Sequence, residues 1–228
     1  MNPRQSWMGG LFLLCYLWVT ACGPTPVPAD SIANAPDYQN PALLERAWQQ
    51  PVAKTYPHPL EYQINGAFCG PATVVNVFQS LGMDHYTQEN LFEKADVSYW
   101  KARFLGLTLD ELKALIEANT ALAVTLQRDL TLEEFRTHLR RVNDPAYRYV
   151  INFSRQPLFG VDIGHFSPLG GYFAESDRVF VLDVLDDYQP FLVPTNRLYA
   201  AMNTVDSETG QKRGLLIIRA DAPSGVSP

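Results

Sequence analysis

Cysteine is the residue type in this chain with the clearest capacity for chemistry. The three cysteines are Cys15, Cys22 and Cys69, and the first two lie in or directly after an apolar N-terminal stretch typical of an export signal. Cys69 is the one thiol left in the body of the chain, and exported proteins normally use cysteines in pairs. Pro71 suits the first turn of a helix, so Cys69 is expected at a helix N-terminus, where the dipole favours the thiolate. We predict that Cys69 is a nucleophile.

A nucleophilic cysteine needs a base, a group that orients the base, and donors for the developing oxyanion. Of the four histidines, His165 opens a predicted strand that could aim its ring. Asp183 lies in the apolar run 179–184, where a carboxylate needs a partner such as a histidine on the adjacent strand. Gln63, six residues before Cys69, could place its amide beside the Cys69 N–H. The alternative is structural: a core hydrogen bond for His165 and a turn or salt bridge for Asp183.

Helical patterns dominate the first half of the domain. Apolar residues recur at helical spacing after Cys69 until Gly82, which predicts a helix over 69–81. Thr108 and Thr131 each stand three residues before a glutamate, the capping-box pattern, and predict two more helices. A shorter helix is expected near Thr87.

The second half changes to short β-branched or aromatic runs separated by Gly, Asp, Asn and Pro. These runs predict antiparallel strands at 147–153, 165–173, 179–185 and 215–219. Helices followed by strands indicate an α+β domain with segregated layers.

The N-terminal residues read as a targeting segment. Residues 1–21 combine Arg4 with an apolar stretch, and Val19-Thr20-Ala21-Cys22 resembles the lipobox of bacterial lipoproteins, in which Cys22 is diacylated. An ordinary secretory signal cleaved near the same place is the alternative. Because Gly23 rather than Asp follows Cys22, we expect an exported lipoprotein anchored at the periplasmic face of the outer membrane.

Composition predicts the limits of the domain and excludes one class of function. The Pro-rich segment 22–40 is expected to be a tether, 41–220 the catalytic domain and 221–228 a flexible tail. With 46% hydrophobic residues the chain can bury one core. Its net charge of −6 argues against nucleic-acid binding. The sequence does not indicate an oligomeric state.

The segment around Cys69 resembles a known family. Residues 63–81, QINGAFCGPATVVNVFQSL, look like the catalytic-cysteine motif of phytochelatin synthases, which are papain-like enzymes. Further matches follow in order at 86–92, 106–112, 148–155, 164–172, 182–184 and 201–204. The resemblance thus covers nearly the whole domain and implies a papain-like cysteine protease fold, with the nucleophile helix in an N-terminal helical part and an antiparallel sheet after it.

The resemblance also implies an activity. Cys69, His165 and Asp183 would form the catalytic triad, with Gln63 stabilising the oxyanion. Cys69 would cleave the amide between the cysteinyl and glycyl parts of glutathione and hold a γ-glutamylcysteinyl thioester, which water or a second glutathione then takes. No protein metal site is visible, and no cofactor is expected on protein side chains. Cadmium or zinc would arrive as a glutathione thiolate complex, in keeping with metal detoxification.

Two departures from the family affect the expected reaction. Plant members carry a second, cysteine-rich half, whereas this chain has no cysteine after Cys69. The stretch after Asp183 carries Asp186 and Asp187 where the family usually has basic and aromatic residues, and these carboxylates would repel an anionic acceptor. Hydrolysis is therefore favoured over transpeptidation.

Arg155 matches a basic position of the family ten residues before His165. It is expected to bind a substrate carboxylate as a fork, or else to be a surface arginine at a strand end. Asn65 and Phe68 are expected to shape the turn before Cys69 rather than to touch substrate.

Three other functions stay open. One is a papain-like peptidase that acts on another peptide. A leader peptidase of the bacteriocin-processing type is a second, although those enzymes carry an acidic residue where Phe68 stands. The third is a lipoprotein that keeps the fold as a non-catalytic binding module.

Overall fold

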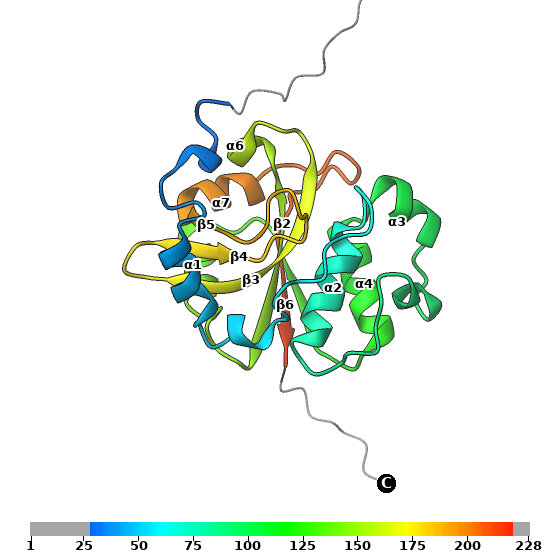
Figure 1. Cartoon of the computed structure of the whole chain (residues 1–228). Helices are drawn as coiled ribbons and strands as arrows, with labels where there is room; N and C mark the ends of the chain where they lie inside the picture. The colour runs from blue at the N-terminus through cyan, green and yellow to red at the C-terminus, as the bar shows by residue number, and fades with distance from the viewer. Residues whose placement is uncertain (1–27, 221–228) are drawn as a thin grey trace, which may run out of the picture.

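The computed structural model describes residues 28–220 (Figure 1). The α-helices are α1 (Pro41–Trp48), α2 (Cys69–Gln79), α3 (Tyr99–Leu105), α4 (Leu109–Asn119), α5 (Leu132–Leu139), α6 (Gln156–Phe159) and α7 (Thr195–Met202). The strands are β1 (Val124–Gln127), β2 (Tyr147–Ser154), β3 (Gly164–Phe173), β4 (Arg178–Val181), β5 (Phe191–Pro194) and β6 (Leu215–Arg219). Short 3-10 helices η1 (Ile32–Asn34), η2 (Ala53–Thr55) and η3 (Asn90–Glu93) complete the described elements.

One six-stranded sheet forms the centre of the domain, in the order β1-β6-β2-β3-β4-β5. All neighbouring strands pair antiparallel. In β3 the register with β4 shifts between Leu169 and Gly171. The expected α+β class, with an antiparallel sheet after the helix that begins at Cys69, is confirmed.

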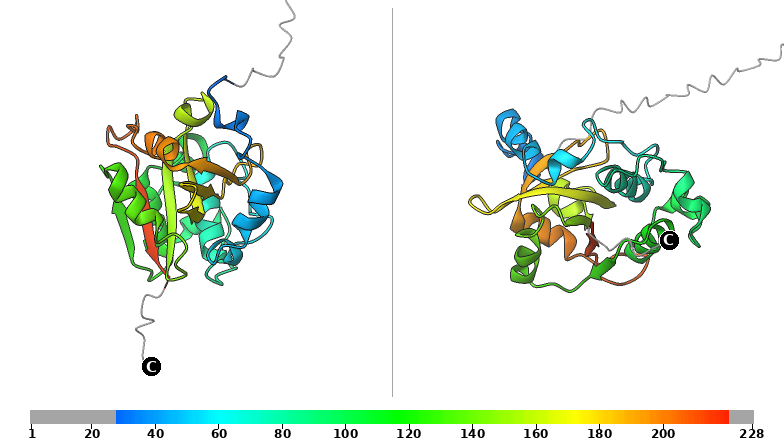
Figure 2. Two further views of the ribbon diagram at one scale, coloured as in Figure 1. Left: turned by 90° about the vertical axis from the view of Figure 1, so that its left-hand side faces the viewer. Right: turned by 90° about the horizontal axis from the view of Figure 1, so that it is seen from below.

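Helices cover both faces of the sheet. Successive side chains of a strand point to opposite faces, so Val150 on β2 joins the core under α2 and α4, whereas Tyr149 and Ile151 join the core under α5, α6 and α7. Figures 1 and 2 show the sheet between these two sets of helices. The two cores hold β3, which carries His165, and β4, which precedes Asp183, from both sides.

Most predicted elements are present, with corrected boundaries. The helices that begin after Thr108 and Thr131 both have complete capping boxes. The helix expected near Thr87 is the 3-10 turn η3. The strand expected over 179–185 ends at Val181, so Asp183 lies in the connection after β4. The sequence prediction missed α1, α3, α6, α7, β1 and β5.

The segment 28–40 differs from the tether expected for it. Ile32 and Tyr38 are buried, at 4% and 7% exposure, in the core beside α6 and α7. The Leu192 backbone N–H donates to the Tyr38 carbonyl at 2.9 Å, and Asp37 forms an ion pair with Arg178. The buried side chains, the hydrogen bond and the ion pair hold this segment on the domain, so the folded part begins before Pro41.

Several expectations lie outside the described residues. These are the signal 1–21, the lipidation site Cys22, the tether as far as residue 27, and the tail 221–228. Within residues 28–220, no helix has the length and apolar character needed to cross a lipid bilayer.

Candidate active site

Cys69 is the first residue of α2 and lies at the inner edge of a pocket. Its side chain is 8% exposed, and α2 packs on β3. An added Cβ on Gly70 would lie 3.1 Å from Leu112 Cδ1, so α2 packs closely on Leu112 directly after Cys69. The first N–H groups of a helix have no acceptor inside the helix. The Cys69 N–H is therefore available to a group that enters the pocket.

His165 and Asp183 come together across two neighbouring strands. His165 is the second residue of β3, and Asp183 follows the end of β4. His165 Nε2 lies 3.0 Å from Asp183 Oδ1, and the Leu185 backbone N–H donates to the same oxygen at 2.9 Å. Both side chains are buried, at 3% and 0% exposure. Because Nε2 faces Asp183, Nδ1 is the ring nitrogen left for the hydrogen bond with Cys69.

The surroundings of Cys69, His165 and Asp183 favour the charged form of each side chain. Burial alone would raise the pKa of the Cys69 thiol, but the hydrogen bond to His165, the charge of His165, the Phe166 backbone and the charge of Arg155 lower it. Burial opposes protonation of His165, yet the charge of Asp183 and hydrogen bonds to Asp183 and Cys69 raise its pKa.

The carboxylate completes this arrangement. Burial would favour the neutral acid, but the charge and hydrogen bond of His165, the charge of Arg155 and the Leu185 N–H hold the pKa of Asp183 below its usual range. The structure therefore brings Cys69, His165 and Asp183 into the arrangement of a thiolate, an imidazolium and a carboxylate.

Arg155 is placed on Asp183 rather than on the pocket wall. Its side chain is 2% exposed, and Nη2 donates to both oxygens of Asp183, at 2.9 and 2.8 Å. Its Cζ lies 3.8 Å from the centroid of the Tyr188 ring. Nη1 is buried and has no hydrogen-bond partner among residues 28–220. Arg155 is thus not the surface arginine that the sequence left as an alternative but a buried cation that contacts Asp183, and its expected contact with a substrate carboxylate stays a prediction.

Gln63 lies in the loop that leads into α2. Its backbone N–H donates to the Val184 carbonyl at 2.9 Å, which links this loop to the residue after Asp183. Its side-chain Nε2 donates to the Asn65 carbonyl at 2.7 Å. A primary amide nitrogen carries two hydrogens, so one N–H remains for another acceptor.

The expected role of Asn65 and Phe68 as turn-shaping residues agrees with their contacts. Asn65 Oδ1 accepts from the Ala67 backbone N–H at 2.8 Å, and the Asn65 carbonyl accepts from the Phe68 N–H at 3.2 Å. Phe68 is fully buried and packs against Phe92 and Tyr99. Asn65 also lines the pocket.

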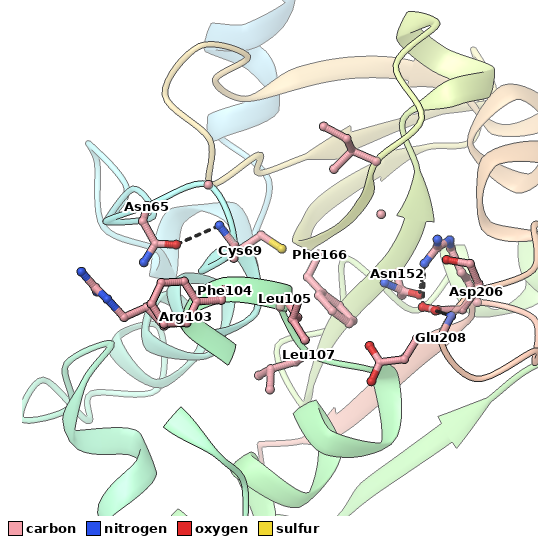
Figure 3. A pocket seen from close by; sticks show the side chains of 17 residues that line it. Asn65, Cys69, Arg103, Phe104, Leu105, Leu107, Asn152, Phe166, Asp206 and Glu208 are labelled. Carbon is pink, nitrogen blue, oxygen red and sulfur yellow. Dashed lines mark hydrogen bonds and ion pairs between the residues drawn. The ribbon is translucent and has the colours of Figure 1, made fainter. Parts of the chain in front are cut away.

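The pocket beside Cys69 has a volume of about 630 Å³. Figure 3 shows the Cys69 side chain at one side of this cavity and Asn152 and Asp206 at the other. Arg213 Nη1 donates to Asp206 Oδ2 at 2.8 Å and lies 3.4 Å from Asn152 Oδ1. The pocket is thus lined by the Cys69 thiol and, on its other side, by the ion pair of Arg213 and Asp206.

Sequence reasoning missed Arg213 and Asp206. The only signal for them was a cluster of polar residues directly before the predicted strand 215–219. Their pairing depends on the turn that joins Val205 to Lys212 by a β-bridge, which no local pattern indicates.

No three His, Cys, Asp or Glu side chains gather as metal ligands in the part of the chain that the structure describes.

Comparisons with known proteins show which family this chain is similar to. The family model described as phytochelatin synthase matches residues 25–215. Glutathione gamma-glutamylcysteinyltransferase 1 of Triticum aestivum is 31% identical over 218 residues, which are 88% of this chain and 43% of that protein. Glutathione gamma-glutamylcysteinyltransferase 3 of Lotus japonicus is 31% identical over 168 residues, or 68% of this chain and 35% of that protein.

The chain spans about two fifths of the length of the plant relatives it matches. Among solved structures, the peptidase domain of Streptococcus ComA, described as a bi-functional ABC transporter involved in a quorum sensing pathway, aligns with a TM-score of 0.47. It is 16% identical, and the alignment covers 69% of this chain and 95% of that one. On its match over residues 25–215, this chain belongs to the phytochelatin synthase family.

Proposed function

We propose that this protein cleaves glutathione into γ-glutamylcysteine and glycine through a thioester on Cys69. One observation carries the proposal: Cys69, which is coupled to the buried His165–Asp183 pair, lines the same pocket as Arg213 and Asp206. The named activity of the plant relatives supports glutathione as the substrate.

The charged pair in the pocket suits a γ-glutamyl group. Arg213 and Asp206 are mostly buried, with 10% and 16% of their side chains exposed. A γ-linked glutamate keeps both its α-carboxylate and its α-ammonium free, so the guanidinium can take the first and the carboxylate the second. An α-linked glutamate has no free α-carboxylate, so the pair would discriminate between the two linkages.

The first half of the reaction follows from the positions of the triad groups. The Cys69 thiolate attacks the carbonyl carbon of the Cys–Gly amide, and the oxyanion accepts hydrogen bonds from the Cys69 N–H and the second N–H of Gln63. The His165 imidazolium then gives its proton to the glycine nitrogen. The C–N bond breaks, glycine leaves, and the γ-glutamylcysteinyl thioester remains.

In the second half, neutral His165 takes a proton from water, and the hydroxide oxygen attacks the thioester carbonyl. The C–S bond breaks, γ-glutamylcysteine leaves, and the thiolate and imidazolium are restored. Asp183 keeps the imidazole ring oriented and stabilises its charged form throughout.

Water is the favoured acceptor. Transfer needs a second, anionic glutathione in place of water. A cavity of about 560 Å³ next to the Gln63 loop is lined by Tyr62 and Asp186, and Asp186 and Asp187 are both exposed. Their charge would repel an anionic acceptor. A cadmium or zinc ion would enter as a thiolate complex with glutathione, and so as part of the substrate.

The test is mass spectrometry of the full chain incubated with glutathione, with and without cadmium. We expect glycine, γ-glutamylcysteine and a γ-glutamylcysteinyl adduct on Cys69, and no adduct in Cys69→Ala. The isomer with an α-linked glutamate serves as the matched substrate control and should not be cleaved. Longer γ-glutamylcysteine oligomers would show that Asp186 and Asp187 do not block the acceptor.

Two outcomes would contradict the proposal. Equal cleavage of the α-linked isomer would point to a peptidase with another substrate. A Cys69 that reacts with thiol reagents but releases no glycine under any condition would favour a binding module.

We further propose that the mature chain begins at a diacylated Cys22 and is held at the periplasmic face of the outer membrane. The lipobox-like residues 19–22 and the absence of Asp after Cys22 support this localisation. The mass of the N-terminal peptide tests the lipid, and separation of inner and outer membranes tests the location. A mature N-terminus without lipid would refute the anchor.

A further inference from the structure

Several large apolar side chains that are exposed on the described surface lie in or near the lining of the pocket beside Cys69. They are Ile64, Trp100, Phe104, Leu105, Val161, Ile163 and Val205, with exposed fractions from 37% to 75%. Phe104, Leu105 and Ile163 line the pocket beside Cys69, and the others adjoin residues that line it. We call this set the apolar rim. Large exposed apolar patches on soluble proteins usually mark an interaction site.

The edge of the rim on α3 is the most exposed. Trp100, Phe104 and Leu105 are 66%, 71% and 75% exposed. The rings of Trp100 and Phe104 stack, with centroids 6.2 Å apart and planes at 13°. Arg103 lies between them on the helix, and no carboxylate among residues 28–220 forms an ion pair with it. Aromatic and leucine side chains beside an arginine free to meet phosphate are typical of helices that lie at a lipid surface.

The N-terminal end of the described chain lies at the same rim. Pro28 packs on Gly160 so closely that an added Cβ there would be 2.4 Å from Pro28 Cγ. Gly160 directly precedes Val161, a member of the rim. Figure 1 shows this N-terminal end beside α6 at the top of the domain, and α3 at the right-hand side.

The short connection from Pro28 to Cys22 then limits the orientation of the domain relative to the bilayer. The six peptide steps from Cys22 to Pro28 span at most about 22 Å, however they are arranged. A domain of this size has a radius of gyration of about 16 Å, so its diameter exceeds that reach. A lipid on Cys22 therefore keeps Pro28, and with it the Val161 end of the apolar rim, within about 22 Å of the bilayer.

We propose that the α3 edge of the apolar rim docks on the lipid surface to which Cys22 anchors the chain. This inference rests on the proposed anchor and not on the proposed reaction. Trp100, Phe104 and Leu105 insert at the boundary between headgroups and acyl chains, and Arg103 meets lipid phosphate. The charged groups of the pocket then lie at the hydrated level of the headgroups, where water-soluble substrates can still reach them.

Tryptophan fluorescence tests the docking directly. A chain processed at Cys22 retains Trp48 and Trp100. The lipidated protein is reconstituted into phosphatidylcholine vesicles whose acyl chains carry bromine, which quenches nearby tryptophan. In Trp48→Phe the remaining emission, from Trp100, should be largely lost. In Trp100→Phe, the matched control, Trp48 should keep its emission because it packs against Phe180 on the core.

Two further variants in the Trp48→Phe background sharpen the test. Phe104→Ser with Leu105→Ser should restore most of the Trp100 emission, because the inserted apolar surface is removed. Val205→Ser, on another part of the rim, should leave the quenching in place. All three side chains are exposed, so a thermal melt should show that each variant stays folded.

The proposal fails if Trp100 is no more quenched than Trp48 in a chain whose mass proves that Cys22 carries lipid. It also fails if the Phe104 and Leu105 substitutions leave the quenching unchanged. A detergent-solubilised dimer that the same substitutions dissociate, with Trp100 unquenched in vesicles, would show that a second copy covers the rim. An unlipidated Cys22 would refute the anchor, and the glutathione assay reads the reaction separately.

Discussion

Replacing Arg155 with methionine tests whether this residue acts through the triad or on the substrate. Arg155 is buried and gives two hydrogen bonds to Asp183, while its Nη1 has no partner among residues 28–220. Methionine has a similar length and no charge. The substitution therefore leaves the buried Asp183 with His165 and the Leu185 N–H as its remaining partners.

Two estimates of the cost agree. Two hydrogen bonds from a charged donor contribute roughly 3–6 kcal/mol together. Breaking a buried ion pair from one side costs about 3–5 kcal/mol. At about 4 kcal/mol, and with a fall of about 2–4 °C per kcal/mol for a domain of this size, Arg155→Met should lower Tm by roughly 8–16 °C. Calorimetry at neutral pH measures this change.

The pH dependence of kcat/KM gives the more specific test. The reactive ion pair exists between the lowered pKa of Cys69 and the raised pKa of His165, so the profile should be bell-shaped. The positive charge of Arg155 lowers both of these pKa values. Its removal should therefore move the acid limb and the alkaline limb to higher pH together.

Matched variants separate this effect from a substrate role. Arg155→Lys keeps the charge and should return both limbs towards the wild-type positions. Arg213→Met, in the pocket, should raise KM and leave the limbs in place. If Arg155→Met raises KM, leaves both limbs unmoved and changes stability by less than about 1 kcal/mol, then Nη1 serves the substrate and our reasoning is wrong.

Three other perturbations have defined outcomes. Asp183→Asn removes the charge that raises the pKa of His165, so the alkaline limb of kcat/KM should move to lower pH; an unmoved limb would contradict the coupling. Thr108→Ala removes the cap of α4 and should cost about 1 kcal/mol in urea unfolding, and a neutral result would show that the capping box is dispensable. Gly214→Ala would place a Cβ 2.0 Å from the Gln127 carbonyl oxygen, so the substitution should lower Tm by several degrees. An unchanged Tm would contradict this packing.

Local signals in the sequence predicted the helices best. Thr108 and Thr131 begin helices through hydrogen bonds within four residues, and such signals need no knowledge of the rest of the fold. By contrast, α7 begins after Pro194 without a side-chain cap. The short strand β1 lies at the edge of the sheet and is defined by its pairing with β6, far away in the chain.

The site shows the same division. Cys69 could be placed from the helix pattern after it. His165 and Asp183 could be proposed from the strand patterns around them, and the family resemblance supported the choice. The role of Arg155 could not be inferred from the sequence. β4 ends at Val181, before Asp183, and the Asp183 carboxylate accepts a hydrogen bond from Arg155, which is 28 residues earlier in the chain. Sequence spacing indicates that an arginine is near a site, but only the fold shows which anion it meets.

The position of β6 in the sheet has a consequence for biogenesis. β6 is the last strand of the domain in sequence, yet it lies between β1 and β2. During synthesis, β1 and β2 are both complete while the partner that joins them is still missing. The sheet can close only after residue 219 has left the ribosome, since contacts between distant segments must wait for both of them. His165 is thus held in a finished sheet only after translation of the domain ends, and partly made chains should be inactive.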